Sequence, residues 1–393
     1  MHIGYIPPED YQNYRLDVMF DGYKWDLQAG EQSTISDAVI LLEKECLAFL
    51  ADSAVALYHE TVTMERMLKS RPDLAIDMGI SEIMADALCE CYYNPNEHIR
   101  MMRFDFHPTT VGWQISEVNS DVPAGYPEAS ILPGLAVRYF EGYEQSHNFG
   151  DVLVERFTEL TPPSSTIAYL HDTHTVEDYQ LLRFIGDLLE RRGYNSLYAD
   201  PAHLKWEHGE AVNIGAIMRH YPIEWLEFNK YADWRSFLNA KTPSCNHPIA
   251  LLTQSKRLPL VWDELGVDIP FWRRLLPKTE CTTTLSKTDG WIFKPAFGRV
   301  GEGINIPGTI SKEENQDITK AARDHPLQWV AQEMFESVPV GAHHLNLGVF
   351  VIDGQFAGLY GRSSKSPRID TEACEIPVLV NIEGSGNGKQ GTV

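Results

Sequence analysis

Residues 99–119 read Ile-Arg-Met-Met-Arg-Phe-Asp-Phe-His-Pro-Thr-Thr-Val-Gly-Trp-Gln-Ile-Ser-Glu-Val-Asn, and this stretch holds two runs with the character of β-strands. The first run ends at Phe106, the second begins at Gly112, and a short connection that contains Pro108 joins them. Two such runs with a short turn-forming connection are typical of an antiparallel hairpin. We therefore expect a β-hairpin over residues 99–119, centred on Val111.

The register of this hairpin would gather charged and amide side chains on one face. Side chains alternate between the two faces of a strand, so Asp105 is expected directly opposite Glu117. The same register sets Arg103 opposite Asn119. Two opposed carboxylates repel each other, whereas a cation between them makes the pair favourable, and Mg²⁺ accepts carboxylate and amide oxygens as ligands. The pattern indicates a magnesium site at these carboxylates and Asn119; the alternative is a surface hairpin whose acids Arg103 neutralises.

A second candidate segment, residues 291–295, is a strand-like run that carries Lys294 into a glycine-rich stretch. The glycines of that stretch are Gly298, Gly301 and Gly303. Glycine lets backbone N–H groups approach phosphate oxygens closely, and lysine supplies a point charge. Lys256 lies earlier in the chain, where the pattern alone reads as a helix surface. The segment indicates phosphate binding; the alternative is an ordinary turn after a strand, because the lysine precedes the glycines, unlike in a P-loop.

Elsewhere the hydrophobic pattern predicts a mixture of helices and strands. Apolar residues at helical spacing predict a long helix over residues 34–58. Residues 166–198 change from strand to helix to strand character, which predicts a βαβ unit. The pair Asp353-Gly354 lies between the apolar runs of residues 345–360 and predicts a second hairpin. We therefore expect an α/β protein with mixed and antiparallel sheets.

Composition and charge narrow the classes of function. The 393 residues are 43% hydrophobic and 22% charged, which is typical of a folded chain of about two or three domains. The net charge of −22 makes nucleic acids and anionic membrane surfaces poor partners. No apolar run approaches the ~18 residues of a membrane helix, and the first residues do not resemble a signal peptide. The six cysteines form no CxxC pair, which disfavours structural zinc and fits a cytoplasmic location.

Several segments, taken in chain order, resemble the glutathionylspermidine synthase family of ATP-grasp ligases. The most specific match is Arg103-Phe104-Asp105-Phe106 followed by Glu117-Val118-Asn119-Ser120-Asp121. The other matching segments are Tyr23-Lys24-Trp25-Asp26, Glu128-Ala129-Ser130, Tyr221-Pro222-Ile223-Glu224-Trp225-Leu226, residues 255–262, residues 294–299, Gln332-Glu333-Met334 and residues 357–362. The matches span most of the chain in the family's order, and the family's fused amidase domain has no counterpart in them.

The resemblance implies roles for particular residues. Asp105, Glu117 and Asn119 match the family's magnesium ligands. Arg103 matches an arginine near the transferred phosphate and the substrate carboxylate, and Arg362 matches the arginine that stabilises the developing charge. The residues that match ATP-binding positions are Lys256, Lys294, Gly298, Arg299, Gly301, Gln332 and Glu333.

The resemblance also implies the fold and its division. We expect an ATP-grasp-like α/β fold in permuted order, because the metal ligands precede the lysines in the chain. Residues 1–160 and 335–393 are expected to build the catalytic lobe with the metal site. Residues 161–245 would form a small α/β domain like the family's pre-ATP-grasp domain, and residues 246–334 an ATP-binding lid.

The activity implied is that of a carboxylate–amine ligase that uses ATP and Mg²⁺, with two ions expected. Its substrates would be a small-molecule or peptide carboxylate and an amine, joined as an amide through an acyl phosphate. Two alternatives from other classes remain: an ATP-binding protein without ligase activity, and a metal-dependent hydrolase that uses Asp105, Glu117 and histidines. The sequence leaves the identity of the acid, the amine and the general base open.

Overall fold

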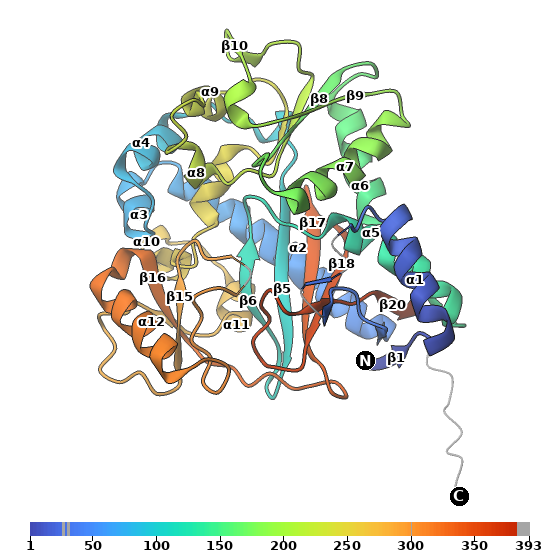
Figure 1. Ribbon diagram of the computed structural model, residues 1–393. Helices are drawn as coiled ribbons and strands as arrows, with labels where there is room; N and C mark the ends of the chain where they lie inside the picture. Colours follow the sequence, from blue (N-terminus) through green and yellow to red (C-terminus); the bar gives the residue numbers. More distant parts are fainter. Residues whose placement is uncertain (26–27, 30–31, 300, 383–393) are drawn as a thin grey trace, which may run out of the picture.

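A five-stranded antiparallel sheet stands at the centre of the molecule (Figure 1). The structure is a computed structural model and describes residues 1–393 except 26–27, 30–31, 300 and 383–393. The strands of the central sheet are, in spatial order, β19 (Cys374–Glu375), β18 (Gln355–Ser364), β17 (His344–Ile352), β5 (Met101–Thr109) and β6 (Gly112–Asn119). The two predicted hairpins are confirmed, and pairing of β5 with β17 brings them side by side although they lie far apart in the sequence.

The β5–β6 hairpin has the predicted register at its charged end. Asp105 pairs with Glu117 and Arg103 pairs with Asn119. Beyond Asp105 the ladder shifts by one residue, which leaves Ser116 as the extra residue of a β-bulge. A bulge bends the strand and turns its side chains in a new direction, so the half of the hairpin near the turn does not follow the simple centred register.

The predicted helix over residues 34–58 is wrong in its first part. Residues Ala38–Leu42 form strand β4, and helix α2 spans Lys44–Leu68. All five residues of β4 are apolar and buried, which is typical of an internal strand covered on both faces. A short apolar run of this kind fits a buried strand as well as a helix, and tertiary packing decides between them. The sheet of β4 has the order β1 (His2–Tyr5), β4, β20 (Val378–Asn381) and β7 (Tyr143–Glu144).

Two smaller sheets accompany the central one (Figure 1). The first is parallel, with the order β13 (Ser244–Cys245), β12 (Ala216–Arg219), β8 (Thr166–Leu170) and β9 (Asn195–Ala199). Helix α7 (Val176–Glu190) connects β8 with β9, so the predicted βαβ unit is confirmed. The second is antiparallel, with the order β14 (Thr279–Glu280), β16 (Trp329–Glu333) and β15 (Trp291–Pro295). Two ribbons complete the strands: β2 (Gln28–Ala29) with β3 (Gln32–Ser33), and β10 (Trp206–Glu207) with β11 (Glu210–Ala211).

The helices cover these sheets. Besides α2 and α7, the longer ones are α1 (Pro8–Asp21), α4 (Glu82–Glu90), α5 (Tyr126–Ala136), α6 (Phe149–Leu160) and α12 (Lys312–Asp324). The shorter ones are α3 (Pro72–Asp77), α8 (Ile223–Leu226), α9 (Trp234–Leu238), α10 (Trp262–Leu265) and α11 (Pro270–Leu275). Helix α12 packs on the three-stranded sheet through Ile318 and Ala322. No helix within the described ranges is both long enough and apolar enough to cross a membrane.

Helix α2 anchors the central sheet. It passes behind β5 and β17 in Figure 1 and buries Leu50, Ala54, Leu57, Met64 and Leu68, which recur at helical spacing. These side chains belong to the same apolar cluster as residues of β17. Full burial of one such leucine contributes about 1.5–3 kcal/mol, so this contact fixes the sheet that carries the charged hairpin.

Each of three sheets takes its strands from a limited part of the chain. The central sheet takes its strands from the part before residue 160 and the part after residue 335. The parallel sheet lies within residues 161–245, and the three-stranded sheet within residues 246–334. The domain boundaries themselves stay a prediction, and we refer to residues 246–334 as the lid segment.

Candidate active site

A cavity of about 640 Å³ receives side chains from the central sheet, from residues 161–245 around the parallel sheet and from the lid segment. Of the predicted site residues it brings together Arg103, Asp105, Glu117, Asn119, Lys294, Arg299, Gly301 and Arg362. We call it the main cavity. Its walls come from strands that are distant in sequence, so the tertiary fold assembles this site.

Arg103 and Asp105 form a two-point ion pair in the wall of the main cavity. The Nε atom of Arg103 is 2.7 Å from Oδ1 of Asp105, and its Nη2 atom is 2.9 Å from Oδ2. Burial alone would lower the pKa of Arg103, but the Asp105 carboxylate raises it above its ordinary value. The guanidinium also lies 4.9 Å from the centre of the Tyr360 ring and donates to the carbonyl of Ala124. Gly348 leaves room for it, because a Cβ there would lie 2.6 Å from Cδ of Arg103.

Glu117 lies among three cations. The Nζ atom of Lys256 is 2.7 Å from Oε2 of Glu117. Burial alone would raise the pKa of Glu117, but Lys256, Lys294 and Arg103 together hold it below its ordinary value. Glu117 is therefore ionised at neutral pH, as a ligand of a divalent cation has to be.

Lys294 is the most enclosed cation of the site, with 4% of its surface exposed. Its Nζ atom donates to Oε1 of Gln332 at 2.6 Å and to the carbonyl of Ser116, the bulge residue of β6, at 3.3 Å. Burial lowers the pKa of Lys294 to about 8, although the nearby Glu117 opposes that shift. The bulge thus directs the backbone carbonyl of Ser116 toward Lys294, a buried cation that could bind an anion.

Two amide side chains lie beside Asp105. Asn119 donates from Nδ2 to Oδ2 of Asp105 at 3.2 Å, and Asn346 on β17 approaches the same oxygen at 3.5 Å. In the described part of the chain the Oδ1 atom of Asn346 is buried without a hydrogen-bond partner. An unpartnered amide oxygen beside two opposed carboxylates matches the donor set that Mg²⁺ prefers. The residues present therefore fit a magnesium ion.

A site of this kind would depend on amide oxygens and on oxygens of the bound substrate. Across the described residues, no group of three or more His, Cys, Asp and Glu side chains could by itself hold a metal ion. Mg²⁺ differs from zinc in keeping water and phosphate oxygens among its ligands. A Mg²⁺ ion at these residues would therefore complete its shell with amide, water or substrate oxygens.

Two further arginines face the main cavity. Arg362 stands on β18 directly opposite Asn346 and donates to the carbonyl of Asp370. Its Nε atom is buried with no hydrogen-bond partner among the residues described. Arg368 donates to the carbonyl of Gly301 at 3.2 Å and lies 3.6 Å from Glu314. Arg368 thus has two carboxylate neighbours, Glu314 and, at 3.4 Å, Asp370. Arg362 donates to a carbonyl oxygen and so keeps its charge available for an anionic group of a substrate.

The glycine-rich loop packs closely against the backbone near residue 369, in the wall of the main cavity. Gly301 has a φ angle of +69°, and a Cβ there would lie 2.5 Å from the carbonyl oxygen of Ile369. Gly298 accepts a hydrogen bond from Nζ of Lys256 at 2.7 Å. Arg299 pairs with Glu224 at 2.7 Å and lies over the ring of Trp225. Gly301 is thus required by its conformation and by packing against residue 369, a reason that the sequence pattern did not indicate.

The predicted residues Lys256 and Gln332 line a second, narrow cavity of about 20 Å³. Its walls include the apolar side chains of Val118, Leu258 and Trp272. Glu333 lines neither cavity: it is exposed, and its backbone N–H donates to the carbonyl of Lys278 at 2.8 Å. The structure therefore brings Gln332 to the site, while it leaves the Glu333 side chain outside both linings.

The predicted set omits several residues that line the main cavity. Lys24 lies 3.0 Å from Glu128 through Nζ and Oε1, and both belong to segments that resemble the family; Asp26 of the same motif lies outside the described residues. His107 is buried, which lowers its pKa to about 4, and its Nε2 atom is 3.0 Å from Oγ of Ser116. For Asn346 a signal exists in the sequence, because it is the one polar residue in the otherwise apolar run 345–352.

Together the mixed sheets, the lid segment and the cavity between them define an ATP-grasp-like α/β protein. The chain belongs to the glutathionylspermidine synthase family: the family model of the glutathionylspermidine synthase pre-ATP-grasp region matches residues 8–381. This match confirms the predicted family and fold class. A comparison with curated proteins found no match.

Solved structures resemble the fold at low sequence identity. A glutathione synthetase-like effector from Globodera pallida, in its apo form, superposes with a TM-score of 0.61 and 12% identity over 95% of this chain and 99% of that chain. A proposed gamma-glutamylcysteine synthetase from Methylobacillus flagellatus gives a TM-score of 0.45 and 11% identity over 76% of this chain and 83% of that chain. At such identity the first likeness shows the fold alone.

Proposed function

We propose that the protein is an ATP- and Mg²⁺-dependent ligase that joins a carboxylate to an amine, with release of ADP and phosphate. The observation that carries the proposal is the convergence of Arg103, Asp105, Glu117, Lys294 and Arg362 on one cavity in a chain of this synthetase family. Phosphoryl transfer needs positioning and charge neutralisation more than covalent help from the protein. The charged side chains in the wall of the main cavity can supply both the positioning and the charge neutralisation.

Lys256 and Lys294 are the residues we assign to the ATP phosphates. Both lie beside Glu117, so in the structure each lysine already has an anionic neighbour that the phosphates would replace. Gln332 lines the narrow cavity, which we assign to the adenine ring. Because that space is only about 20 Å³, its walls have to separate when the base enters. We therefore infer that nucleotide binding moves the lid segment.

Asp105, Glu117 and Asn119 would hold Mg²⁺, with Asn346 as a further oxygen donor. When bound, the ion neutralises charge on the phosphates and keeps the γ-phosphate in line for transfer. The residues of the chain do the remaining work of the site. Arg103 can turn part of its guanidinium from Asp105 toward the transferred group only if Asp105 gains another cation, so the two roles are linked.

The reaction proceeds in two displacements. A carboxylate oxygen of the acid substrate attacks the γ-phosphorus, and the bond from that phosphorus to the bridging oxygen of the β-phosphate breaks, which releases ADP. The amine nitrogen then attacks the acyl carbon of the acyl phosphate, gives up a proton and expels inorganic phosphate. Arg362 faces the cavity with a guanidinium that could bridge two oxygens of the group in transfer, where negative charge develops.

The same arrangement bears on the division of the chain. We propose that residues 1–160 and 335–393 form the catalytic lobe, residues 161–245 the small α/β domain and residues 246–334 the lid. We do not pursue the hydrolase alternative, because across the described residues no group of three or more His, Cys, Asp and Glu side chains could hold a metal ion. The proposal therefore keeps ATP, Mg²⁺, an acid and an amine as the ligands.

The test is a screen of amino acids, peptides and polyamines in pairs, with release of ADP as the readout. We expect Mg²⁺-dependent ADP release for at least one acid–amine pair, and none in Lys294→Met with the same pair. ATP binding without ADP release for any pair would instead support a nucleotide-binding protein without ligase activity. Failure to bind ATP at all would contradict the proposal in both forms.

A further inference from the structure

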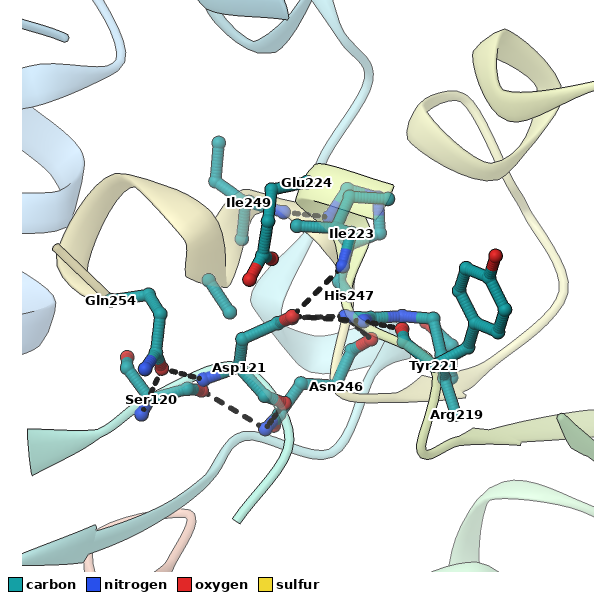
Figure 2. A network of polar contacts seen from close by, with 12 residues as sticks. Ser120, Asp121, Arg219, Tyr221, Ile223, Glu224, Asn246, His247, Ile249 and Gln254 are labelled. Carbon is teal, nitrogen blue, oxygen red and sulfur yellow. Dashed lines mark hydrogen bonds and ion pairs between the residues drawn. The ribbon is translucent and has the colours of Figure 1, made fainter. Parts of the chain in front are cut away.

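The residue pair that follows the charged hairpin is enclosed by side chains from another part of the molecule. Ser120 and Asp121 come directly after Asn119, the last residue of β6. Figure 2 shows them surrounded by Gln254, Asn246 and Arg219. Such a complete enclosure of a loop is unusual, because loop backbone normally makes its hydrogen bonds to water.

Both peptide groups of this pair are held from two sides. The Oε1 atom of Gln254 accepts hydrogen bonds from the backbone N–H groups of Ser120 and Asp121, each at 2.7 Å (Figure 2). The Nδ2 atom of Asn246 donates to the carbonyl oxygens of Ser120 at 3.1 Å and Asp121 at 2.8 Å. The position of the hairpin end is thus defined by the segment from Asn246 to Gln254.

The segment from Asn246 to Gln254 leads directly to Lys256, the lysine that we assign to the ATP phosphates. Gln254 is two residues before Lys256. The backbone N–H of Lys256 donates to the carbonyl of Ala296 at 2.9 Å, and its Nζ atom reaches both Glu117 and Gly298 at 2.7 Å. A short path therefore runs from the candidate metal ligands through Gln254 to the lysine and on to the glycine-rich loop.

The side chain of Asp121 ties the pair to the parallel sheet as well, because its partner Arg219 is the last residue of β12. It accepts from Arg219 in a fully enclosed ion pair, with side-chain exposures of 0% and 2%, and from the backbone N–H of Ile223 at 3.1 Å. Removing one partner of a buried pair costs about 3–5 kcal/mol, so variants of Asp121 or Arg219 would confuse folding with function. Gln254 is uncharged and half-buried, and it is the better residue for a test.

We propose that Gln254 is a positioning residue that fixes the end of the metal-binding hairpin relative to Lys256. Through it, occupation of the metal site and binding of the nucleotide phosphates favour each other. The inference rests on the proposed ATP and Mg²⁺ binding. Gln254 also lines the narrow cavity that we assign to the adenine ring, so the measure of its positioning role is the coupling between the two ligands and not the nucleotide affinity itself. Its single oxygen sets the spacing between Asn119 and the lysine, and both ends of that spacing have to fit the same Mg²⁺–nucleotide complex.

The test measures this coupling in place of turnover. The affinity for the non-hydrolysable analogue adenosine 5′-(β,γ-imido)triphosphate is determined with and without Mg²⁺ by isothermal titration calorimetry, and the ratio of the two dissociation constants is the coupling. Loss of the two hydrogen bonds in Gln254→Ala should reduce that ratio on the order of tenfold. Gln254→Glu keeps an oxygen acceptor and should restore most of the ratio.

Two further variants separate positioning from general destabilisation. Gln254→Asn retains the amide but shortens the side chain by one methylene, so it should reduce the ratio as well, and it carries the test if Gln254→Ala does not fold. Gln145 is the matched control, because its amide also makes two hydrogen bonds to backbone groups outside both cavities, here by donating to the carbonyls of Ser130 and His147. Gln145→Ala should leave the ratio unchanged.

The outcomes distinguish the inference from the function on which it rests. An unchanged ratio in folded Gln254→Ala and Gln254→Asn overturns the positioning role even when both affinities fall in parallel. Failure of Gln254→Glu to recover any of the lost ratio overturns it too, since an acceptor oxygen is then not what matters. If the unmodified protein binds no analogue at all, the proposed function fails first, and the inference falls with it.

Discussion

The Nζ atom of Lys256 lies 2.7 Å from Oε2 of Glu117, so a residue assigned to phosphate binding is paired with a residue assigned to metal binding. The side chains are 9% and 23% exposed, which makes the pair largely enclosed. Each charge stabilises the other until a ligand separates them. Arg103 and Asp105 form a second such pair in the wall of the main cavity, which Glu117 also lines. A Mg²⁺–nucleotide complex would replace both pairs at once, with the ion at the carboxylates and the phosphates at the cations.

The first prediction concerns Glu117. Glu117→Gln keeps the shape of the side chain but removes the charge that faces the ion, and loss of one partner from an enclosed charge pair costs about 2–5 kcal/mol in binding. We therefore expect the affinity for Mn²⁺, used as a probe for Mg²⁺ in the nucleotide complex, to fall at least about thirtyfold. Electron paramagnetic resonance of free Mn²⁺ measures this affinity.

A control for this prediction is Glu313→Gln on the exposed face of α12, which removes the same charge away from the cavity. It should leave the Mn²⁺ affinity unchanged. Equal Mn²⁺ affinity in Glu117→Gln and the unmodified protein would remove the hairpin from the metal site, although the fold and the family assignment would stand.

The second prediction concerns the pH dependence of nucleotide binding through Lys294. Its pKa is lowered to about 8 by burial, so the ammonium loses its proton as the pH rises through about 8. A neutral lysine no longer attracts phosphate, and affinity for ATP should therefore fall above pH 8, by up to about tenfold per pH unit. Titrations between pH 7 and pH 9.5 measure the fall. Lys294→Arg stays charged over this range and should give a flat profile; a parallel decline in that variant would assign the effect to another group.

How much of this site is predictable from the sequence depends on the range of the interactions. The pairing of Asp105 with Glu117 is predictable because a hairpin is local and strand alternation is regular. The bulge at Ser116 is not, since nothing in its neighbours distinguishes a shifted ladder from a regular one. Long-range pairing is beyond a single sequence altogether: Asn346 meets Asp105 only because β17 lies beside β5.

The strand β4 illustrates a different limit. A pattern of apolar residues at helical spacing runs from Ala38–Leu42 into the start of α2, past the charged residues 43–45. Residues Ala38–Leu42 form a strand because they are buried on both faces. That burial depends on the neighbouring strands β1 and β20, and β20 lies at the other end of the chain. The resemblance to the family located Arg103 and Lys294 without this knowledge, whereas Gln254 becomes visible only through its contacts in space.

The third prediction concerns stability in acid. Burial lowers the pKa values of His98, His107 and His220 to about 4, below the ordinary value of 6.5. The unfolded chain therefore takes up protons first, and the stabilisation present above pH 6.5 is lost as the pH falls toward 4. Each histidine should lower the free energy of unfolding by about 2 kcal/mol at pH 5 relative to pH 7.5. Urea unfolding at the two pH values measures this loss.

A variant isolates one histidine from the many carboxylates that also titrate. His98 interacts through Nδ1 with Ser244, and His98→Asn retains a polar group near that position while it removes the titration. Its loss of stability between pH 7.5 and pH 5 should be smaller than that of the unmodified protein by about 2 kcal/mol. Equal losses in the two proteins would show that His98 is not protonated on unfolding in this range.

The fourth prediction concerns the glycine-rich loop. A Mg²⁺–nucleotide complex in the cavity should oppose local opening near Arg299, and proteases cleave segments that open locally. We expect trypsin to cut after Arg299 at least several times more slowly when Mg²⁺ and ATP are saturating. Cleavage after Arg191, whose side chain is largely exposed and outside the cavity lining, is the internal control and should not change. Identical rates at Arg299 with and without nucleotide would indicate a plain turn.

The fifth prediction separates binding from chemistry at Arg362. This guanidinium stands opposite Asn346 at the cavity wall, and its contacts in the described chain leave Nε without a partner. If it acts where charge develops during transfer, its loss lowers kcat and leaves substrate affinity nearly unchanged. Removing one such contact typically costs about 10²–10³ in rate, which is the effect expected for Arg362→Ala.

Arg362→Lys makes the test specific for the guanidinium. A planar guanidinium bridges two oxygens of one group, whereas an ammonium offers a single point of charge, so lysine should restore only a small part of kcat. The measurement is kcat and ATP affinity for both variants with an acid–amine pair that the unmodified protein joins. Near-normal kcat with weaker ATP binding in both variants would make Arg362 a binding residue. The charge that develops in the transfer would then have to be met by Arg103, released from Asp105, or by Arg299, released from Glu224.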